Sequence, residues 1–166
     1  SFDYIVELLK NLVDNYEFRL SPLHFASITN NPQMIKHILS ETENPNSTDD
    51  CGLTALMYAC IHGHIDVIDA LLEDERIEVY GFDTEYRSTL HLACISGNIE
   101  IVKRILQYKE IEDNINEKVK YGETILAFVS MLGYNEIVEY LLNHPSLAVN
   151  GVNPKIKTNS YDDPLT

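Results

Sequence analysis

Residues 88–106 read STLHLACISGNIEIVKRIL, and three other segments of the chain align with this one without an internal gap. The other segments are residues 21–39 (SPLHFASITNNPQMIKHIL), 54–72 (TALMYACIHGHIDVIDALL) and 124–142 (TILAFVSMLGYNEIVEYLL). Their first residues are 33, 34 and 36 positions apart. Self-similarity at such a period is the sequence signature of a repeat architecture, in which stacked units share one continuous core.

Each segment begins with a helix-capping residue and reaches a turn residue nine positions later. Ser and Thr side chains accept hydrogen bonds from the first exposed amides of a helix, and they occupy all four starts: Ser21, Thr54, Ser88 and Thr124. Pro22 also suits a first helical position. The turn residues tolerate the left-handed backbone that ends a helix: Asn30, Gly63, Gly97 and Gly133. A second amphipathic pattern follows, so each unit is predicted to be helix, turn and helix.

Several of these motifs resemble one known family. Residues 21–26 (SPLHFA) and 88–93 (STLHLA) resemble the ankyrin signature T-P-L-H-x-A, whose period is 33 residues. Residues 49–54 (DDCGLT) are similar to the ankyrin hairpin, and residues 97–103 (GNIEIVK) to its turn and second helix. The resemblance covers roughly residues 16–150. It implies an all-α solenoid of stacked helix-turn-helix units with hairpin-like connecting loops.

We expect a single domain over residues 1–166. Its parts are an N-terminal cap or degenerate repeat helix (1–15), four repeats (16–48, 49–82, 83–118 and 119–153) and the start of a further, truncated repeat or tail (154–166). The connections between successive units lengthen from 15 to 16 to 18 residues, and Tyr86 stands where a hairpin glycine is expected. The shape of the later hairpins therefore stays open.

The composition excludes several classes of function. The chain of 166 residues has 12 Lys and Arg against 26 Asp and Glu, a net charge of -14. Nucleic acids are held by clustered cations, so no nucleic-acid binding is expected. One interpretation of the negative charge is that it attracts a protein partner with a basic patch. A solvated acidic face would explain the charge equally well. No apolar stretch approaches the ~18–20 residues of a membrane helix, so membrane insertion is not expected. Three sparse cysteines favour an intracellular, cytoplasmic setting.

Two groups of side chains invite a catalytic or metal-binding interpretation. Cys60, His62 and His64 alternate, but residues two apart on a helix point about 200° apart. Cys60 also shares its repeat position with Cys94, where a small buried residue is expected. For His24 and His91, the resemblance implies hydrogen bonds that tie neighbouring hairpins. We therefore expect no metal, no cofactor and no catalytic residue, and the protein is not expected to be an enzyme.

The resemblance also implies where a partner binds, namely the hairpin tips and the inner surface of the first helices. The candidate contacts at these positions are Phe18, Leu20, Ile28, Leu53, Ile61, His62, Arg87, Ile95, Tyr121, Met131 and Leu132. Exposed apolar surface often marks an interface, and turn tips have little core in which to hide, so Phe18, Leu20, Leu53 and Tyr121 are favoured. At the inner-helix positions, packing between adjacent helices is an equally good explanation.

The sequence therefore predicts a non-enzymatic protein–protein interaction module. The alternative is a targeting or autoinhibitory ankyrin domain of a larger multidomain enzyme whose catalytic part is absent here. A weaker hypothesis is that Asn46, Asn116 or Asn150 accepts side-chain hydroxylation, as asparagines of ankyrin hairpins do, although a turn-forming role explains these residues better.

Overall fold

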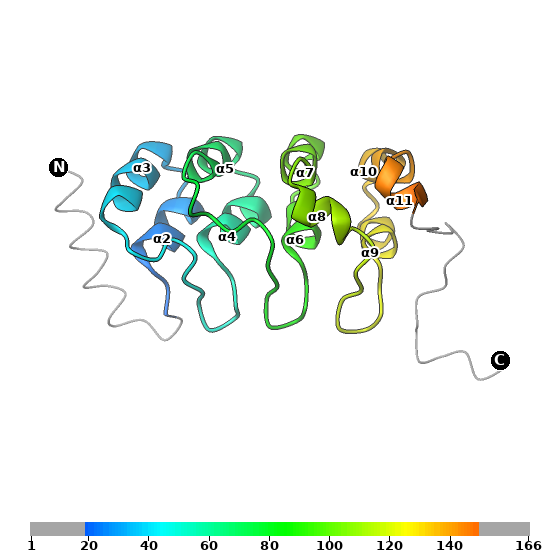
Figure 1. Cartoon of the computed structure of the whole chain (residues 1–166), viewed down its shortest axis with the longest axis horizontal. Helices are drawn as coiled ribbons and strands as arrows, with labels where there is room; N and C mark the ends of the chain where they lie inside the picture. The colour runs from blue at the N-terminus through cyan, green and yellow to red at the C-terminus, as the bar shows by residue number, and fades with distance from the viewer. Residues whose placement is uncertain (1–18, 150–166) are drawn as a thin grey trace.

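The computed structural model describes residues 19–149 (Figure 1). The helices that it describes are α2 (Pro22–Ile28), α3 (Pro32–Glu41), α4 (Ala55–His62), α5 (Ile65–Leu72), α6 (Thr89–Ile95), α7 (Ile99–Leu106), α8 (Lys109–Asp113), α9 (Ile125–Leu132), α10 (Asn135–Leu142) and α11 (Pro145–Val149). The predicted N-terminal helix, the predicted truncated repeat and Phe18 lie outside the described residues.

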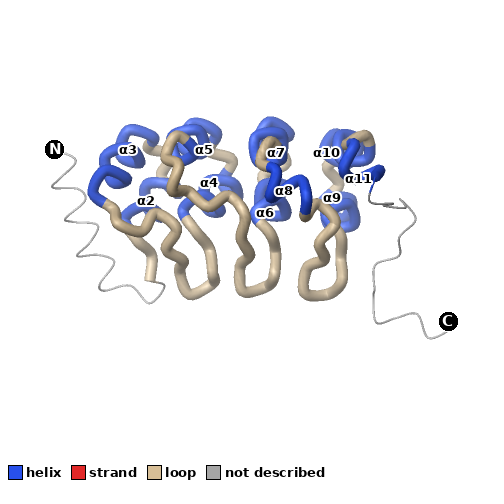
Figure 2. The backbone as a smooth tube through the Cα atoms, viewed as in Figure 1, coloured by secondary structure: helices blue, strands red, loops and turns tan. Residues whose placement is uncertain are grey.

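The helices form two layers (Figures 1 and 2). One layer holds the first helix of each unit (α2, α4, α6 and α9), and the other holds the second (α3, α5, α7 and α10). The loops before the first helices project as a row of hairpins along one edge. In residues 19–149 the only strand-like pairings are the bridges Phe82–Ser88 and Lys118–Thr124. The predicted all-α solenoid of helix pairs is confirmed.

The repeated start and turn residues cap and end the first helices, as the sequence predicts. Each capping hydroxyl accepts a hydrogen bond from the amide three residues later, at 3.3–3.4 Å in all four units. The four turn residues have left-handed φ angles of +54° (Asn30), +74° (Gly63), +72° (Gly97) and +77° (Gly133). Local residue chemistry thus sets the bounds of the first helices.

The hairpins share one backbone shape, which the sequence alone left open. The residue two before each unit start is left-handed: Arg19 (φ +52°), Gly52 (+75°), Tyr86 (+59°) and Gly122 (+77°). The last three hairpins are each closed by an amide-to-carbonyl bond of the same register: Asp49–Leu53, Asp83–Arg87 and Val119–Glu123. Tyr86 therefore takes the place and the conformation of a glycine.

Two short helices, α8 and α11, were not predicted. Each follows the second helix of its unit, and α8 takes up part of the longest connection. Both contribute to the core, since Ile111 of α8 and Leu147 of α11 are buried. The side chains of Ser146 and Glu112 are also hydrogen-bonded to each other, which joins the two helices. The extra residues of the later units thus contribute side chains to the core.

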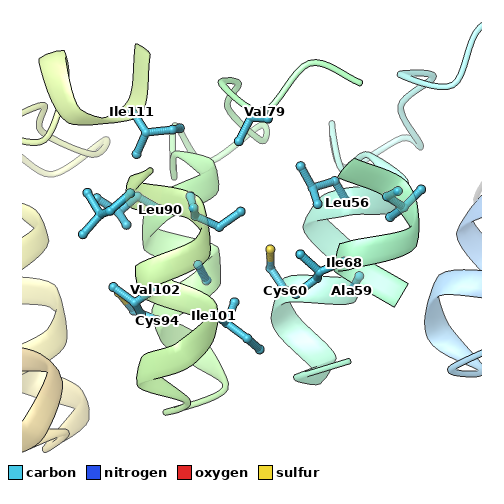
Figure 3. Close-up of a cluster of buried hydrophobic side chains, with 14 of the residues drawn as sticks. Leu56, Ala59, Cys60, Ile68, Val79, Leu90, Cys94, Ile101, Val102 and Ile111 are labelled. Carbon is cyan, nitrogen blue, oxygen red and sulfur yellow. The ribbon is translucent and has the colours of Figure 1, made fainter. Parts of the chain in front are cut away.

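The hydrophobic core runs without a break from unit to unit. Figure 3 shows side chains of neighbouring units in it, among them Leu56, Ile68, Leu90 and Ile101. Cys60 and Cys94 are fully buried, as expected for the small-residue position. Burial raises the pKa of the Cys94 thiol to about 12 and raises that of Cys60 as well, so both thiols stay protonated and behave as apolar groups. Stacking, rather than any single helix pair, supplies this core.

Candidate protein-binding surface

The exposed edge of the stack is formed by the hairpin row, which we define as residues 19–20, 49–53, 83–87 and 119–123. In each of two hairpins, a buried aspartate holds the backbone by accepting hydrogen bonds from its amides. Asp49 Oδ1 accepts hydrogen bonds from the amides of Cys51 (2.9 Å) and Leu53 (2.8 Å), and Oδ2 accepts one from the Tyr58 hydroxyl (2.6 Å). Sequence reasoning missed this role, although Asp49 and Asp83 both stand five residues before a unit start.

Asp83 repeats this arrangement in the next hairpin. It accepts from the amides of Glu85 and Arg87, both at 2.9 Å, and forms an ion pair with the Arg87 guanidinium at 2.7 Å. Arg87, a predicted contact residue, is therefore half-buried and already held by its own hairpin. The carboxylates fix the hairpin backbones before any partner arrives.

Neighbouring hairpins are also joined to each other. The Thr84 amide donates to the Cys51 carbonyl at 2.9 Å. Lys120 Nζ lies 3.1 Å from Glu85 Oε2, which links the last two hairpins. The hairpin row is consequently a preformed surface, and binding to it would cost little ordering entropy.

Of the two histidines predicted to link neighbouring hairpins, His24 forms the link and His91 does not. His24 Nδ1 accepts from the Ser21 amide (2.8 Å), so Nε2 donates to the Leu53 carbonyl of the next hairpin (2.9 Å), and that prediction is confirmed. His91 Nδ1 pairs with the Ser88 hydroxyl (2.7 Å), but its buried Nε2 has no partner in the described part of the chain. The following unit starts 36 residues later instead of 33, and no carbonyl comes within reach.

The predicted apolar contacts of the hairpins divide into exposed and buried residues. Tyr121 is 69% exposed at a hairpin tip, and Leu20 is half-buried. The expectation that Leu53 is exposed is wrong, because only 8% of it is accessible and it packs with Met57 and Leu92. Leu53 immediately precedes the capping residue of α4, where the chain already turns back toward the core.

The inner-helix positions follow the packing alternative in the middle of the stack. Ile28, Ile61 and Ile95 are half-buried, and the last two pack against the cluster of Leu53, Met57 and Leu92. Met131 (64%) and Leu132 (39%) are exposed on α9, the first helix of the last described unit. These two inner-helix candidates are therefore exposed, as the binding interpretation predicts.

His62 is the exposed member of a stack of rings on the inner surface. Its ring lies 6.3 Å from that of Tyr58 and 5.7 Å from that of His64, nearly parallel to both. Burial and, after it, the charge of His64 lower the pKa of His62. His64 Nδ1 donates a hydrogen bond to the Ser27 carbonyl oxygen at 2.8 Å. Across residues 19–149, no three His, Cys, Asp or Glu side chains are placed to hold a metal ion together.

An exposed aromatic residue of the hairpin row, Tyr86, was not predicted as a contact. Tyr86 is 63% exposed and is flanked by Glu85 and Arg87. The sequence did show its unusual place, because an aromatic residue stands where two other hairpins have glycine, but the resemblance did not select that position. Together with Tyr121, Tyr86 gives the hairpin row two exposed aromatic rings.

The second helices present a charged face held by ion pairs. Three of these pairs are Lys36–Glu73 (2.7 Å), Asp69–Arg104 (2.7 Å) and Glu100–Lys103 (2.9 Å). The first two join successive units, which fits the expected solvated face with a structural role. In the described residues, no helix is long and apolar enough to cross a membrane.

Of the three asparagines considered as hydroxylation sites, Asn46 has a structural role. The Asn46 carboxamide donates to the Arg76 carbonyl (2.7 Å) and accepts from the Glu78 amide (2.8 Å), so it bridges two successive connections. The carboxamide of Asn116 has no hydrogen-bond partner within residues 19–149, and Asn150 lies outside them.

Helix pairs stacked in two layers, with a row of hairpins and one shared core, define a helical repeat solenoid. The sequence matches the family described as "Ankyrin repeats (3 copies)" over residues 2–83 and 77–158. The chain belongs to the ankyrin-repeat family, whose repeats are non-catalytic units that typically mediate protein–protein interaction.

Segments of several curated proteins of different kinds are similar in sequence to this chain. A probable E3 ubiquitin-protein ligase, XBOS33, from Oryza sativa subsp. japonica is 42% identical over 52 residues, which are 31% of this chain and 10% of that protein. Osteoclast-stimulating factor 1 from Xenopus laevis is 34% identical over 77 residues, 46% of this chain and 33% of that protein. The tankyrase poly(ADP-ribose) polymerase from Caenorhabditis elegans is 33% identical over 60 residues, 36% of this chain and 3% of that protein. The chain thus matches only a tenth to a third of the first two relatives' length.

Proposed function

We propose that this chain is a non-enzymatic protein–protein interaction module that binds its partner through the hairpin row and the inner surface of the first helices. The observation that carries the proposal is the preformed state of the hairpin row. Buried carboxylates shape its hairpins, and the bonds from Thr84 and Lys120 join them. Such a surface presents Tyr86 and Tyr121 in fixed positions, and rigid aromatic side chains are frequent anchors of interfaces.

The charge of the hairpin row supports a partner with a basic patch. The described residues of the row contain five carboxylates and three cations. Each cation is already in an ion pair with a carboxylate of the same row: Arg19–Asp50, Arg87–Asp83 and Lys120–Glu85. The two carboxylates without an ion pair in the row are Asp49, which is buried, and Glu123. Glu123 leaves the accessible charge of the row slightly negative, which favours the approach of basic proteins at low salt.

Mapping the surface of a bound partner tests the proposal directly. The immobilised chain captures a partner, which is identified by mass spectrometry, purified and added back for hydrogen exchange. We expect protection in the hairpin row and none on the outer faces of α5, α7 and α10. Tyr121→Ser should weaken capture, whereas Leu142→Ser on α10 serves as the matched control, since Leu142 is also exposed. Protection confined to the second helices would overturn the surface, and failure to capture any protein would overturn the function.

A second candidate is a targeting or autoinhibitory domain within a larger enzyme. It is supported by the similarity to segments of a probable ubiquitin ligase and of a poly(ADP-ribose) polymerase, in which the matched part is a small share of the protein. The coding sequence on both sides of these residues discriminates the two candidates. A catalytic domain in the same reading frame would favour the second, and further repeats alone would favour the first.

We also propose an intracellular, reducing environment. Cys51 is exposed and the other two cysteines are buried, and all three are free thiols. An exposed free thiol is rare in secreted domains, where disulfides persist. Imaging of the tagged full-length protein tests this, and a secreted product with oxidised Cys51 would contradict it.

A further inference from the structure

The first helices and the turns that follow them carry no formal charge, although the chain as a whole is strongly charged. Asp, Glu, Lys and Arg make up 23% of the sequence, but none of them occurs in residues 22–31, 55–64, 89–98 or 125–134. Four such stretches would hold about ten charged side chains at the frequency of an average protein. The charges of this chain are therefore confined to the hairpins, the second helices and the connections.

The accessible part of this surface forms an uncharged strip along the stack. It follows the row of first helices in Figure 1, on or directly after α2, α4, α6 and α9. The seventh position after each unit start is always aliphatic, and Met131 (64% exposed) and Leu132 (39%) are its most exposed apolar members. We define the inner strip as the seventh and eighth residues after each start, all at least partly exposed: Ile28, Thr29, Ile61, His62, Ile95, Ser96, Met131 and Leu132.

The inner strip also has few free hydrogen-bonding groups. The Thr29 hydroxyl donates to the Phe25 carbonyl at 2.9 Å, and the Ser96 hydroxyl donates to the Ala93 carbonyl at 3.4 Å. The imidazole of His62 makes ring contacts but no hydrogen bond within residues 19–149. Burial and, after it, the charge of His64 keep the pKa of His62 below its ordinary value, so the strip is uncharged at neutral pH.

We propose that the inner strip binds the apolar face of an amphipathic α-helix of a partner protein. The inference rests on the proposed interaction function and names the structure and chemistry of the partner segment. A charged face would lose its water on this strip and find no opposite charge there, which is costly, whereas aliphatic side chains gain from burial against those of the strip.

Hydrogen bonding and spacing favour a helix over an extended segment. An extended segment would lose water from its backbone amides and carbonyls, and the strip has few groups to replace that water, whereas a helix satisfies these groups internally. The first helices of neighbouring units pack against each other, and packed helices lie ~8–10 Å apart. Seven residues of a helix rise ~10.5 Å, so a heptad matches one unit of the stack, while side chains on one face of a strand recur every ~6.6 Å.

Labelled peptides test the helix. The whole chain is titrated into fluorescein-labelled three-heptad peptides, used at nanomolar concentration against self-association, and binding is followed by fluorescence anisotropy. The probe contains alanine and glutamine, with leucine at the first and fourth positions of each heptad. One control peptide has the same leucines distributed around the helix, and the other has a central alanine replaced by proline. We expect saturable binding of the probe that does not weaken between about 0.05 and about 0.5 M sodium chloride, and at least about tenfold weaker binding of both controls.

Charged substitutions in the chain test the strip. His62→Glu and Met131→Glu each place a carboxylate in it, and both residues are exposed, so the fold should be kept. Each should weaken binding of the probe by at least about tenfold, because the new charge is buried without a partner in the complex. Gln107→Glu adds the same charge at an exposed position directly after α7 and should leave the affinity unchanged. Circular dichroism verifies the fold of all three variants.

Several results would overturn the proposal. They are the absence of probe binding, equal binding of the distributed-leucine peptide, and wild-type affinity in both His62→Glu and Met131→Glu. Equal binding of the proline peptide would mean that the occupant is extended, and would overturn the helix. If a captured partner protein still protects the hairpin row from hydrogen exchange in these cases, the interaction function stands while the helix-binding strip falls.

Discussion

Replacing Gly97 by alanine should destabilise the stack much more than the same change at Gly133. Both glycines end a first helix with a left-handed φ, +72° and +77°, so each alanine costs about 1–2 kcal/mol of backbone strain. At Gly133 a new Cβ meets no atom within 4 Å. At Gly97 it would lie 2.9 Å from Cε1 and Cζ of Tyr134, well inside the ~3.5–4.0 Å of a carbon contact.

The clash at Gly97 forces the Tyr134 ring to move. That ring donates its hydroxyl hydrogen bond to the Ile95 carbonyl at 3.1 Å and so joins two units. Overpacking adds about 1–3 kcal/mol and the strained hydrogen bond about 1 kcal/mol. We therefore expect Gly97→Ala to lower the free energy of unfolding by about 3–6 kcal/mol, against about 1–2 kcal/mol for Gly133→Ala.

Urea unfolding followed by far-UV circular dichroism measures both values. A double-mutant cycle isolates the contact, because in a Tyr134→Ala background the cost of Gly97→Ala should fall to that of Gly133→Ala. The reasoning is refuted if Gly97→Ala costs no more than Gly133→Ala, or costs the same with and without the Tyr134 ring.

Three further predictions concern the hairpins and the core. Asp49→Ala removes the acceptor of two amides and one hydroxyl and should cost about 2–4 kcal/mol in urea unfolding, whereas Asp50→Ala should stay within about 0.5 kcal/mol of the wild type; equal costs would contradict the assigned role of Asp49. Burial lowers the pKa of His91 from 6.5 to about 4 in the folded protein, so the unfolded chain binds a proton at this imidazole more readily. The free energy of unfolding should therefore fall by up to about 3 kcal/mol as the pH drops from 6.5 to about 4. His91→Gln should flatten that part of the profile of unfolding free energy against pH, and an unchanged slope would exclude His91 as its source. In the native protein only Cys51 should react rapidly with a thiol reagent, while the unfolded chain should titrate three thiols; rapid reaction of a second native thiol would contradict the burial of the other two.

The fold could be predicted because its signals are local and repeated. A serine or threonine cap, followed by a residue that tolerates left-handed φ, sets the bounds of each first helix whatever its neighbours are, and four copies in phase exclude coincidence. The conformation of Tyr86 and the helix α8 were harder to predict. An aromatic residue in a glycine position gives no sign of a left-handed turn, and the five residues of α8 have mixed polarity with no strong helical pattern. Stacking on the adjacent unit decides their conformation.

The binding surface could be predicted only in outline. The hairpin row and the exposure of Tyr121 follow from the register of the repeat. The burial of Leu53 and the half-burial of Ile61 and Ile95 depend on how closely adjacent first helices approach, which one unit's sequence does not encode. The link between Lys120 and Glu85 joins residues 35 positions apart, so it exists only once the units have stacked.

Stability and recognition therefore depend on different side chains of the same hairpins. The links between units are made by groups that face the neighbouring repeat, such as the imidazole of His24 and the hydroxyl of Tyr134. Tyr86 and Tyr121 take no part in these two links, and more than half of each residue is exposed. Because each link joins only adjacent units, a change at a hairpin tip leaves the stack intact, while a change such as Gly97→Ala loosens one junction and shifts the hairpins on either side. Binding should therefore respond to both kinds of change, but the free energy of unfolding only to the second.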